Sequence, residues 1–256
     1  MASLSFERFE YKYLLPGPLL GAVRGFIAPY TRPDAHAGGR YTVTNLYLDT
    51  PELDFYQEHL LGAADRFKLR LRTYDPSGGV FLEVKRKIKN VVVKSRVEVP
   101  RDRYRGLLEG GEEISLDELP AAHLEEFLSR SIRGGVRPVV LIEYDREAYE
   151  SVMEDETRIT FDRGLRFQPF EELELEGRGG WTHMDSAADM GAASSPILVE
   201  LKFNTTCPAW MVDLVRTFSL ERQSFSKYMA AMWRHLEESA DDPRWDRISI
   251  LEDPHD

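Results

Sequence analysis

The segment RFKLRLR alternates basic and apolar residues, so that its cations fall at every second position. These cations are Arg66, Lys68, Arg70 and Arg72. Side chains alternate between the two faces of a β-strand, so the cations share one face and the apolar residues share the other. Burying like charges together costs several kcal/mol per ion unless an opposite charge is present. The spacing therefore predicts a strand face that binds a polyanion.

The same alternation recurs in three further segments, FLEVKRKIK, VVVKSRVEV and ILVELKF. Their charged positions are Glu83, Lys85, Lys87 and Lys89, then Lys94, Arg96 and Glu98, then Glu200 and Lys202. A solvated charged face of an antiparallel sheet would explain any one of these strands. Repetition in several strands disfavours that explanation. If the sheet closes into a barrel, the charged face can point inward, and a polar interior is compatible with a ligand-holding barrel.

Composition and charge narrow the class of protein. Of the 256 residues, 42% are hydrophobic and 30% are charged, as in an ordinary soluble globular protein. The net charge of −11 argues against nucleic-acid binding, which usually needs a basic surface, and a basic cavity in an acidic body selects compact polyanions. The only cysteine, Cys207, excludes an intramolecular disulfide and indicates a reducing compartment. No apolar run reaches membrane-spanning length, so a cytoplasmic protein without a transmembrane segment of its own is expected.

Strands dominate the expected order of elements, with helices between them. The expected strands are SFERFEYKYLL, TVTNLYLDT, RFKLRLRTY, VFLEVKRKI, VVVKSRVEVP, VVLIEYDREAY, ETRITFDRGL and ILVELKF. Helices are expected after Pro16, from Thr50 to Gly62, across about residues 101–133, and in the closing segments PAWMVDLVRTF and SKYMAAMWRHLEE. A long acidic loop is expected at 171–194. We expect a single domain over residues 1–238 and a polar tail over 239–256.

Common phosphate, metal and nucleophile motifs are absent from the sequence. It contains no P-loop, no Rossmann glycine motif after a strand, no HExxH and no GxSxG. A phosphate enzyme with this sequence would therefore hold phosphates with side chains rather than with a glycine-rich loop. Arginine suits that task, because its planar fork makes two hydrogen bonds to phosphate oxygens.

Nine segments in order resemble the VTC domain, the polyphosphate polymerase branch of the triphosphate tunnel (CYTH-like) superfamily. They are FEYKYLL, NLYLDT, KLRLRTY, LEVKRK, KSRVEV, EYDREAY, RITFD, VELKF and FSKYMAAM, spanning roughly residues 6–232. The resemblance implies an α+β fold, an antiparallel eight-stranded β-tunnel closed into a barrel with helices packed outside. It also implies a metal-dependent phosphotransferase that extends inorganic polyphosphate with the γ-phosphate of ATP, using Mn²⁺ or Mg²⁺.

The resemblance also implies roles for individual residues. Arg70, Arg72 and Lys85 would bind the transferring phosphate, and Glu200 would hold the metal. Phosphate-binding residues carried over by position are Lys12, Lys94, Arg146, Arg158 and Lys227. Residues that share the charged strand faces join them, namely Lys68, Lys87, Arg96 and Lys202. With a polyanion as their partner, removal of Arg70 and Arg72 relieves repulsion, so the melting temperature is expected to hold or rise.

Two positions depart from the family pattern. The superfamily often begins with ExExK, but Arg8 stands at the first acidic position and leaves only Glu10 and Lys12. A second lysine that some members carry before the FSKY lysine is Ser224 here, with Arg222 nearby. Arg8 favours a long polyanion over a metal-bound triphosphate, but two alternatives stay open, a triphosphatase of the same superfamily and a non-catalytic polyphosphate-binding module. A nucleotide cyclase is disfavoured by the incomplete acidic pair, and any membrane coupling would come from a membrane-protein partner.

Overall fold

The computed structural model describes residues 8–74, 78–89, 91–110, 121–186 and 194–238. The expected polar tail over 239–256 lies outside these residues. The chain forms two compact units. The first unit comprises Met1–Thr42, Glu143–Arg166 and His183–Phe225, and the second comprises Val43–Ile142, Phe167–Thr182 and Ser226–Asp256. In the described part of the chain, no helix is both long and apolar enough to cross a membrane.

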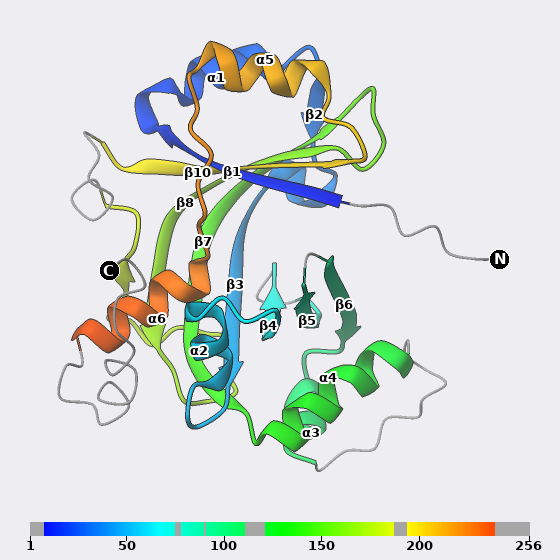
Figure 1. The fold of residues 1–256 in the computed structure, drawn as a ribbon, viewed down its shortest axis with the longest axis vertical. Coiled ribbons are helices and arrows are strands. Elements are labelled where there is room, and N and C mark those ends of the chain that lie inside the picture. Colours follow the sequence, from blue (N-terminus) through cyan, green and yellow to red (C-terminus); the bar gives the residue numbers. More distant parts are fainter. Residues whose placement is uncertain (1–7, 75–77, 90, 111–120, 187–193, 239–256) are drawn as a thin grey trace. The chain divides into compact units, whose positions relative to one another are not determined.

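The first unit packs two helices on a group of antiparallel strands. Its elements are β1 (Arg8–Pro16), η1 (Gly17–Leu19), α1 (Leu20–Ile27), β2 (Thr31–Pro33), η2 (His36–Gly39), β10 (Pro196–Asn204), α5 (Ala209–Thr217) and parts of β3, β7 and β8. Strand β1 pairs with β10, and β10 pairs with β8. Helices α1 and α5 lie side by side (Figure 1) and bury Val23, Met211 and Leu214 against Phe161 and Val199. Because the apolar residues of these strands face the helices, the intervening charged residues share the other face.

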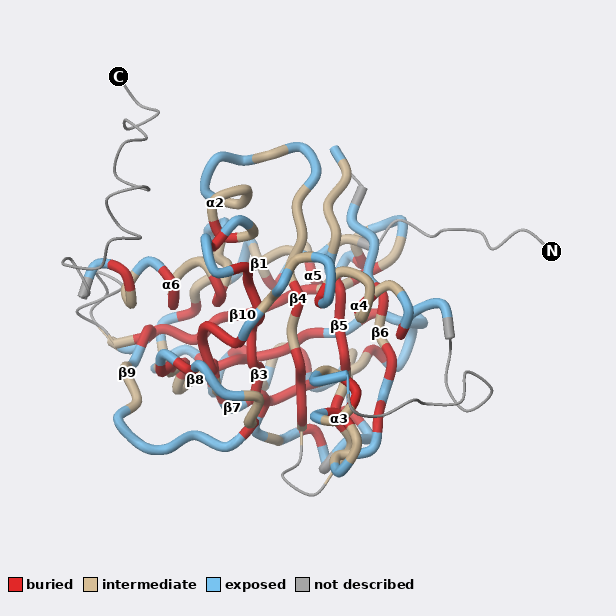
Figure 2. The backbone as a smooth tube through the Cα atoms, turned by 90° about the horizontal axis from the view of Figure 1, so that it is seen from below, coloured by how far each residue is buried: buried red, intermediate tan, exposed pale blue. Residues whose placement is uncertain are grey.

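The second unit is an antiparallel meander with four helices. Its elements are β3 (Arg40–Asp49), α2 (Asp54–Leu60), β4 (Asp65–Thr73), β5 (Val80–Ile88), β6 (Val91–Val99), α3 (Tyr104–Leu108), α4 (Ala121–Gly134), α6 (Lys227–Glu238) and parts of β7 (Arg137–Ser151) and β8 (Arg158–Pro169). The apolar side chains of the meander are buried, as Figure 2 shows in red along these strands, and include Leu69, Leu71, Leu82, Val84 and Val97. The predicted alternation in RFKLRLR is therefore confirmed on its apolar side.

The hydrogen-bonded strand order is β1-β10-β8-β7-β3-β4-β5-β6, with β2 paired to β7 and the short β9 (Thr182–His183) paired to β8. The described residues contain no pairing between β1 and β6, the two ends of this order. The predicted antiparallel α+β fold with helices is confirmed, but the predicted closed barrel is corrected to an open sheet. Alternation in the sequence shows which face of a strand is polar, whereas closure depends on whether the first and last strands meet, which alternation does not encode.

Several element boundaries also differ from the prediction. Helix α2 begins at Asp54 rather than at Thr50, because Leu53 adopts a left-handed conformation with φ 59°. The N-cap is therefore Leu53 and the predicted Thr50 N-cap is wrong, although the Thr50 hydroxyl accepts the Asp54 N–H at 2.9 Å. The expected helical interval is divided between α3 and α4, with residues 111–120 outside the described part. The expected 171–194 loop contains β9, and the short β2 was not predicted.

Candidate functional site

Basic residues of the second unit converge on one buried carboxylate, Glu83 of β5. The register places Arg70 of β4 and Arg96 of β6 on either side of it. Arg70 Nη2 lies 2.5 Å from Glu83 Oε2, and Lys94 Nζ lies 2.9 Å from Oε1. Arg96 Nε is 3.6 Å from Oε1, and Arg72 Nε is 3.9 Å from Oε2. We call Glu83, Arg70, Arg72, Lys94 and Arg96 the Glu83 cluster.

The Glu83 cluster holds a surplus of positive charge. Burial opposes ionisation of Glu83, which is 1% exposed, but Arg70, Arg72 and Lys94 outweigh it and hold the pKa of Glu83 well below its usual range. Burial, with Arg70 and Arg72, lowers the pKa of Lys94 to about 8, against the opposing attraction of Glu83. One carboxylate therefore faces four cations, and the surplus favours an anionic ligand.

The ion pairs of Glu83 change the melting temperature that we expect when Arg70 and Arg72 are removed. Arg70 donates to it from Nε at 2.6 Å, so this arginine is an ion-pair partner of a buried carboxylate. Removing one partner of a buried pair leaves an uncompensated charge and destabilises the fold. These contacts lead us to expect that loss of Arg70 and Arg72 lowers the melting temperature, which is the opposite of the expectation from the sequence.

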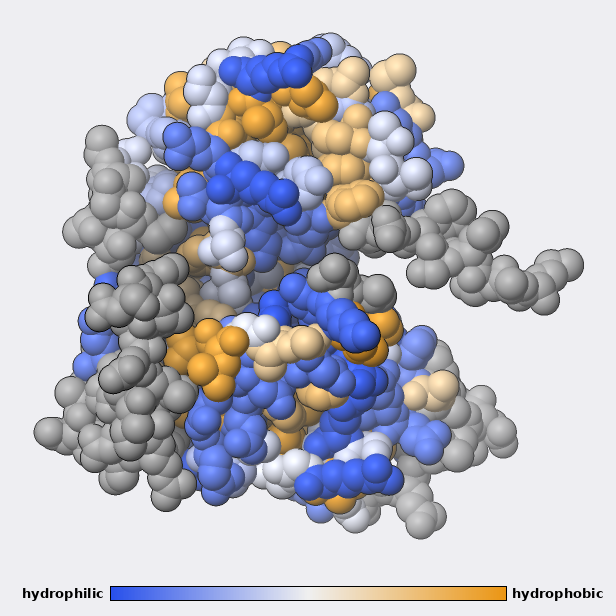
Figure 3. All heavy atoms as spheres, in the orientation of Figure 1, coloured by the Kyte–Doolittle hydropathy of each residue, from blue (hydrophilic) through white to orange (hydrophobic). Residues whose placement is uncertain are grey.

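Three further predicted lysines surround the Glu83 cluster in the strand register. Lys85 lies opposite Lys94 on β6 and opposite Lys68 on β4, and Lys87 follows on the same face of β5. Lys68 donates to the Ser226 hydroxyl at 2.7 Å. Figure 3 shows hydrophilic side chains, in blue, gathered over the region of β5 and β6. The structure therefore brings the predicted cations of β4, β5 and β6 onto one face of the second unit.

Two residues of β3 that sequence reasoning missed position the arginines. Asn45 lies opposite Arg72 and accepts from its Nε at 2.7 Å, and Tyr47 lies opposite Arg70 and accepts from its Nη1 at 3.0 Å. Asn45 and Tyr47 alternate with buried Leu46 and Leu48, so period two in TVTNLYLDT already placed them on the polar face. Their register against β4 carried no signal in the sequence.

Tyr47 packs against Tyr228, which in turn hydrogen-bonds to Asp49. Its ring stacks on Tyr228 of α6 with 4.9 Å between the centroids. The Tyr228 hydroxyl donates to Asp49, which also accepts the N–H groups of Phe55 and Tyr56 at 2.9 Å. Burial raises the pKa of Asp49 to about 6, although these hydrogen bonds oppose the rise. The predicted Lys227 is buried at the first position of α6, next to Tyr228.

A second charged cluster lies in the first unit and centres on Glu200 of β10. Arg146 Nη2 is 3.2 Å from Glu200 Oε2, and Lys202 Nζ is 2.7 Å from the same oxygen. Lys12 Nζ lies 3.9 Å from Oε1. Arg146 also donates from Nε and Nη2 to Asp162, both at 2.7 Å. We call Glu200, Arg146, Lys202, Lys12 and Asp162 the Glu200 cluster.

Charge in the Glu200 cluster is closer to balance than in the Glu83 cluster. Burial would lower the pKa of Arg146, but the charges of Asp162 and Glu200 raise it well above its ordinary value. Lys12 also lies 3.5 Å from Glu10, and its ammonium donates to the Phe225 carbonyl at 2.7 Å. These cations have protein partners before any ligand binds, so the Glu200 cluster is a preorganised ion-pair network.

The remaining predicted positions of the first unit lie beside this network. Arg158 of β8 is opposite Lys202 in the register, and its Nη1 pairs with Asp34 at 3.3 Å. The guanidinium of Arg222 lies 4.0 Å from the centre of the Tyr11 ring. Arg222, close in sequence to Ser224, therefore packs on an aromatic ring of β1.

Glu200 offers a partial donor set for a divalent metal. Arg146 and Lys202 occupy its Oε2, while Oε1 faces Lys12 at a distance beyond hydrogen bonding. The described residues hold no group of three or more His, Cys, Asp or Glu placed to bind a metal. Magnesium is commonly bound through one or two carboxylates together with substrate phosphates. The donors therefore fit a metal that binds with phosphate, through Glu200 and the neighbouring Glu10, and do not form a complete protein-only site.

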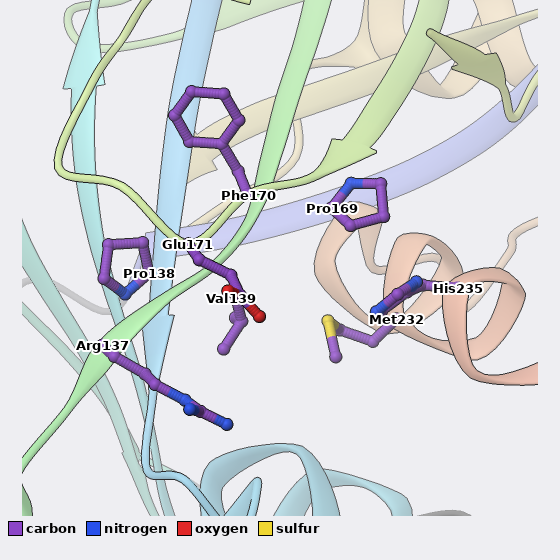
Figure 4. A pocket seen from close by; sticks show the side chains of 8 residues that line it. All are labelled: Arg137, Pro138, Val139, Pro169, Phe170, Glu171, Met232 and His235. Carbon is purple, nitrogen blue, oxygen red and sulfur yellow. The ribbon is translucent and has the colours of Figure 1, made fainter. Parts of the chain in front are cut away.

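A pocket of about 270 Å³ in the second unit lies apart from this chemistry (Figure 4). It is formed by the start of β7, the end of β8 and α6. Its lining residues are Arg137, Pro138, Val139, Pro169, Phe170, Glu171, Met232 and His235. None of the predicted site residues lines it, so the pocket does not mark the phosphate chemistry.

Comparisons with known proteins agree with this fold. A solved putative adenylyl cyclase from Hippeastrum, described as having a dominant triphosphatase activity, is 16% identical, with a TM-score of 0.50 and coverage of 91% of this chain and 96% of its own. A putative adenylate cyclase from Bacillus halodurans is 12% identical, with a TM-score of 0.48 and coverage of 85% and 92%. At 16% identity the likeness to the Hippeastrum protein shows the fold alone, and no curated protein matches the sequence. The family model of the VTC domain matches residues 7–235, and the chain therefore belongs to the VTC-domain family.

Proposed function

We propose that this chain is a polyphosphate polymerase that transfers the γ-phosphate of ATP to the end of an inorganic polyphosphate chain. The observation that carries the proposal is the Glu83 cluster, where four cations converge on one buried carboxylate. A surplus of fixed positive charge favours a ligand with repeated negative charge. Membership of the VTC-domain family supports a phosphate chain as that ligand.

The mechanism requires positioning and charge neutralisation rather than covalent catalysis. In this proposal Arg70, Arg72 and Lys85 bind the transferring phosphoryl group. A terminal oxygen of the polyphosphate attacks the γ-phosphorus, the bond to the β–γ bridging oxygen breaks, and ADP leaves. The attacking phosphate oxygen is already anionic, so no general base is needed. Asn45 and Tyr47 fix the two guanidinium groups and reduce the reorganisation needed when charge develops.

Glu200, with Glu10 beside it, would hold the Mn²⁺ or Mg²⁺. When bound, the metal would supply positive charge that offsets the negative charge of the phosphates. Lys12 lies between these two carboxylates, 3.5 Å from Glu10 and 3.9 Å from Glu200. Its ammonium therefore lies close to both carboxylates, which share one face of the sheet. Polyphosphate oxygens would compete with the carboxylates for Lys12, which frees the carboxylate oxygens for the metal.

Two alternative functions are each supported by one observation. A triphosphatase is supported by the Hippeastrum protein of similar fold, which is described as having a dominant triphosphatase activity. A non-catalytic polyphosphate-binding module is supported by Glu200 itself, because Arg146 and Lys202 already neutralise its charge. In the first case water replaces polyphosphate as the acceptor, and in the second case the phosphate chain binds without turnover.

Incubation with ATP and Mn²⁺ tests the proposal directly. We expect purified protein to produce polyphosphate chains that are resolved by size on a gel, together with ADP. The Lys85→Ala variant should lose this activity, whereas Arg133→Ala, which removes an exposed cation of α4, should retain it. Release of orthophosphate without polyphosphate chains would show that the protein is a triphosphatase and not a polymerase. Tight polyphosphate binding without ATP turnover would identify a binding module.

Lys94 predicts a pH dependence of phosphate binding. Because its pKa is about 8, its charged fraction falls as the pH rises from 7 to 9. We expect tripolyphosphate affinity to fall about tenfold over this range, which corresponds to about 1.4 kcal/mol, or one charge-assisted contact. The Lys94→Arg variant keeps its charge at pH 9, so its affinity should change little. Isothermal titration at both pH values measures this, and an equal fall in Lys94→Arg would assign the dependence to another group.

A further inference from the structure

A third cluster of charge surrounds Glu147 of β7, which is 2% exposed. Three arginines of the first unit converge on it, Arg24 from α1, Arg40 from the start of β3 and Arg163 from β8. Glu147 follows Arg146 directly in the strand, so their side chains point to opposite faces of the sheet. We call Glu147 and its three arginines the Glu147 cluster, and it lies on the face opposite the Glu200 cluster.

Arg24 and Tyr149 already satisfy the Glu147 carboxylate. Arg24 donates from Nε to Oε1 at 2.7 Å and from Nη2 to Oε2. The Tyr149 hydroxyl donates to Oε1 at 2.5 Å. Burial opposes ionisation of Glu147, but the hydrogen bonds from Arg24 and Tyr149 and the charges of Arg24 and Arg40 lower its pKa. One bidentate arginine and one hydroxyl therefore supply the side-chain hydrogen bonds to this buried charge, and Arg40 adds electrostatic attraction without a hydrogen bond.

The other two arginines, Arg40 and Arg163, lie near Glu147 but do not donate hydrogen bonds to it. Arg40 Nε lies 3.8 Å and Arg163 Nη2 lies 3.7 Å from the same oxygen, Glu147 Oε2, which is beyond hydrogen-bond reach. Neither guanidinium donates a hydrogen bond to another side chain in the described residues. Their side chains are 64% and 43% exposed, so the donors are open to solvent. Three positive charges around one negative charge repel one another, and that repulsion is relieved by an added anion.

We propose that Arg24, Arg40 and Arg163 form a separate binding site for a phosphate group. Guanidinium forks match phosphate oxygens in pairs, and two of these forks have donors available. Convergence of the forks at one point suits a compact tetrahedral anion rather than an extended chain lying along a strand. The phosphate group is either free inorganic phosphate or the terminal phosphate of a polyphosphate. The site goes beyond the proposed polymerase reaction and does not depend on it.

Arginine Nε–H signals in an NMR titration give a local test. Adding inorganic phosphate to the full-length protein should shift the Nε–H signals of Arg40 and Arg163, assigned by single substitution. The Arg40→Ala/Arg163→Ala variant should bind one phosphate group fewer per chain in a calorimetric titration. Its melting temperature without phosphate should stay close to that of the wild type, because Arg24 and Tyr149 keep their hydrogen bonds to Glu147.

Arg32→Ala is the matched control. Arg32 belongs to the same unit and is 66% exposed, close to the 64% of Arg40, but it pairs with Glu150 at 3.1 Å. The Arg32→Ala variant should therefore bind as many phosphate groups per chain as the wild type. Shifts with inorganic phosphate identify free phosphate as the ligand, and shifts only with polyphosphate identify a chain end. Unshifted Arg40 and Arg163 signals with both probes, or equal stoichiometry in the double variant and wild type, would overturn the site.

Discussion

The Arg70→Ala/Arg72→Ala variant should lose ATP-dependent polyphosphate synthesis and should also unfold at a lower temperature than the wild type. Each arginine is proposed to contact the transferring phosphate, and loss of one such donor typically costs a factor of about 10²–10³ in rate. The stability loss follows from Glu83, which is buried and pairs with Arg70 Nη2 at 2.5 Å. Lys94 and Arg96 remain as counter-charges, so we expect about 1–3 kcal/mol rather than the full cost of an isolated buried charge.

A third substitution separates the two effects. Adding Glu83→Gln removes the buried charge that the two arginines neutralised, so the triple variant should regain much of the lost melting temperature. It should not regain synthesis, because the phosphate contacts are still missing. Thermal melts and gel-sized products of the double and triple variants measure both quantities. Recovery of synthesis in the triple variant would show that Arg70 and Arg72 act only by stabilising the fold.

The two faces of the strands could be predicted from the sequence, because period two in RFKLRLR is a local property. Leu69 and Leu71 are buried, and Arg70 and Arg72 point to the polar side, as the alternation requires. The role of Glu83 could not be predicted, because it depends on the register of three strands. The alternation grouped Glu83 with Lys85 on one face, and only the pairing with β4 and β6 makes it the centre of four cations.

The Glu147 cluster and the open sheet could not be predicted because both depend on contacts between segments that are distant in the sequence. Arg24, Arg40 and Arg163 lie on three elements and follow no common pattern, so nothing in the sequence links them to Glu147. The closed barrel is implied by the family resemblance, and polar strand faces alone do not require closure. A polar face is also compatible with an open sheet when each buried charge has a partner, as Glu83 does here.

Glu200→Gln should lower metal-dependent ATP turnover by about 10²–10³-fold while polyphosphate still binds. Glutamine keeps the shape of the side chain but removes the charge that a hard cation needs. Arg146 keeps Asp162 as a partner at 2.7 Å, whereas Lys202 loses the carboxylate that lies 2.7 Å away. The uncompensated lysine should cost about 1–2 kcal/mol of stability and should hold or raise the affinity for polyphosphate.

Asp162→Asn gives the comparison that isolates the metal. Asp162 pairs with the same Arg146 but has no proposed metal contact, so its substitution should lower the melting temperature without changing the Mn²⁺ concentration that gives half-maximal turnover. Turnover measured against Mn²⁺ concentration, with melts of both variants, separates the two roles of the network. Near-normal metal-dependent turnover in the Glu200→Gln variant would show that Glu200 does not hold the metal and serves only as an ion-pair partner of Arg146 and Lys202. Glu10 together with substrate phosphates would then be the next candidate for the metal site, and Glu83 would not, because four cations surround it.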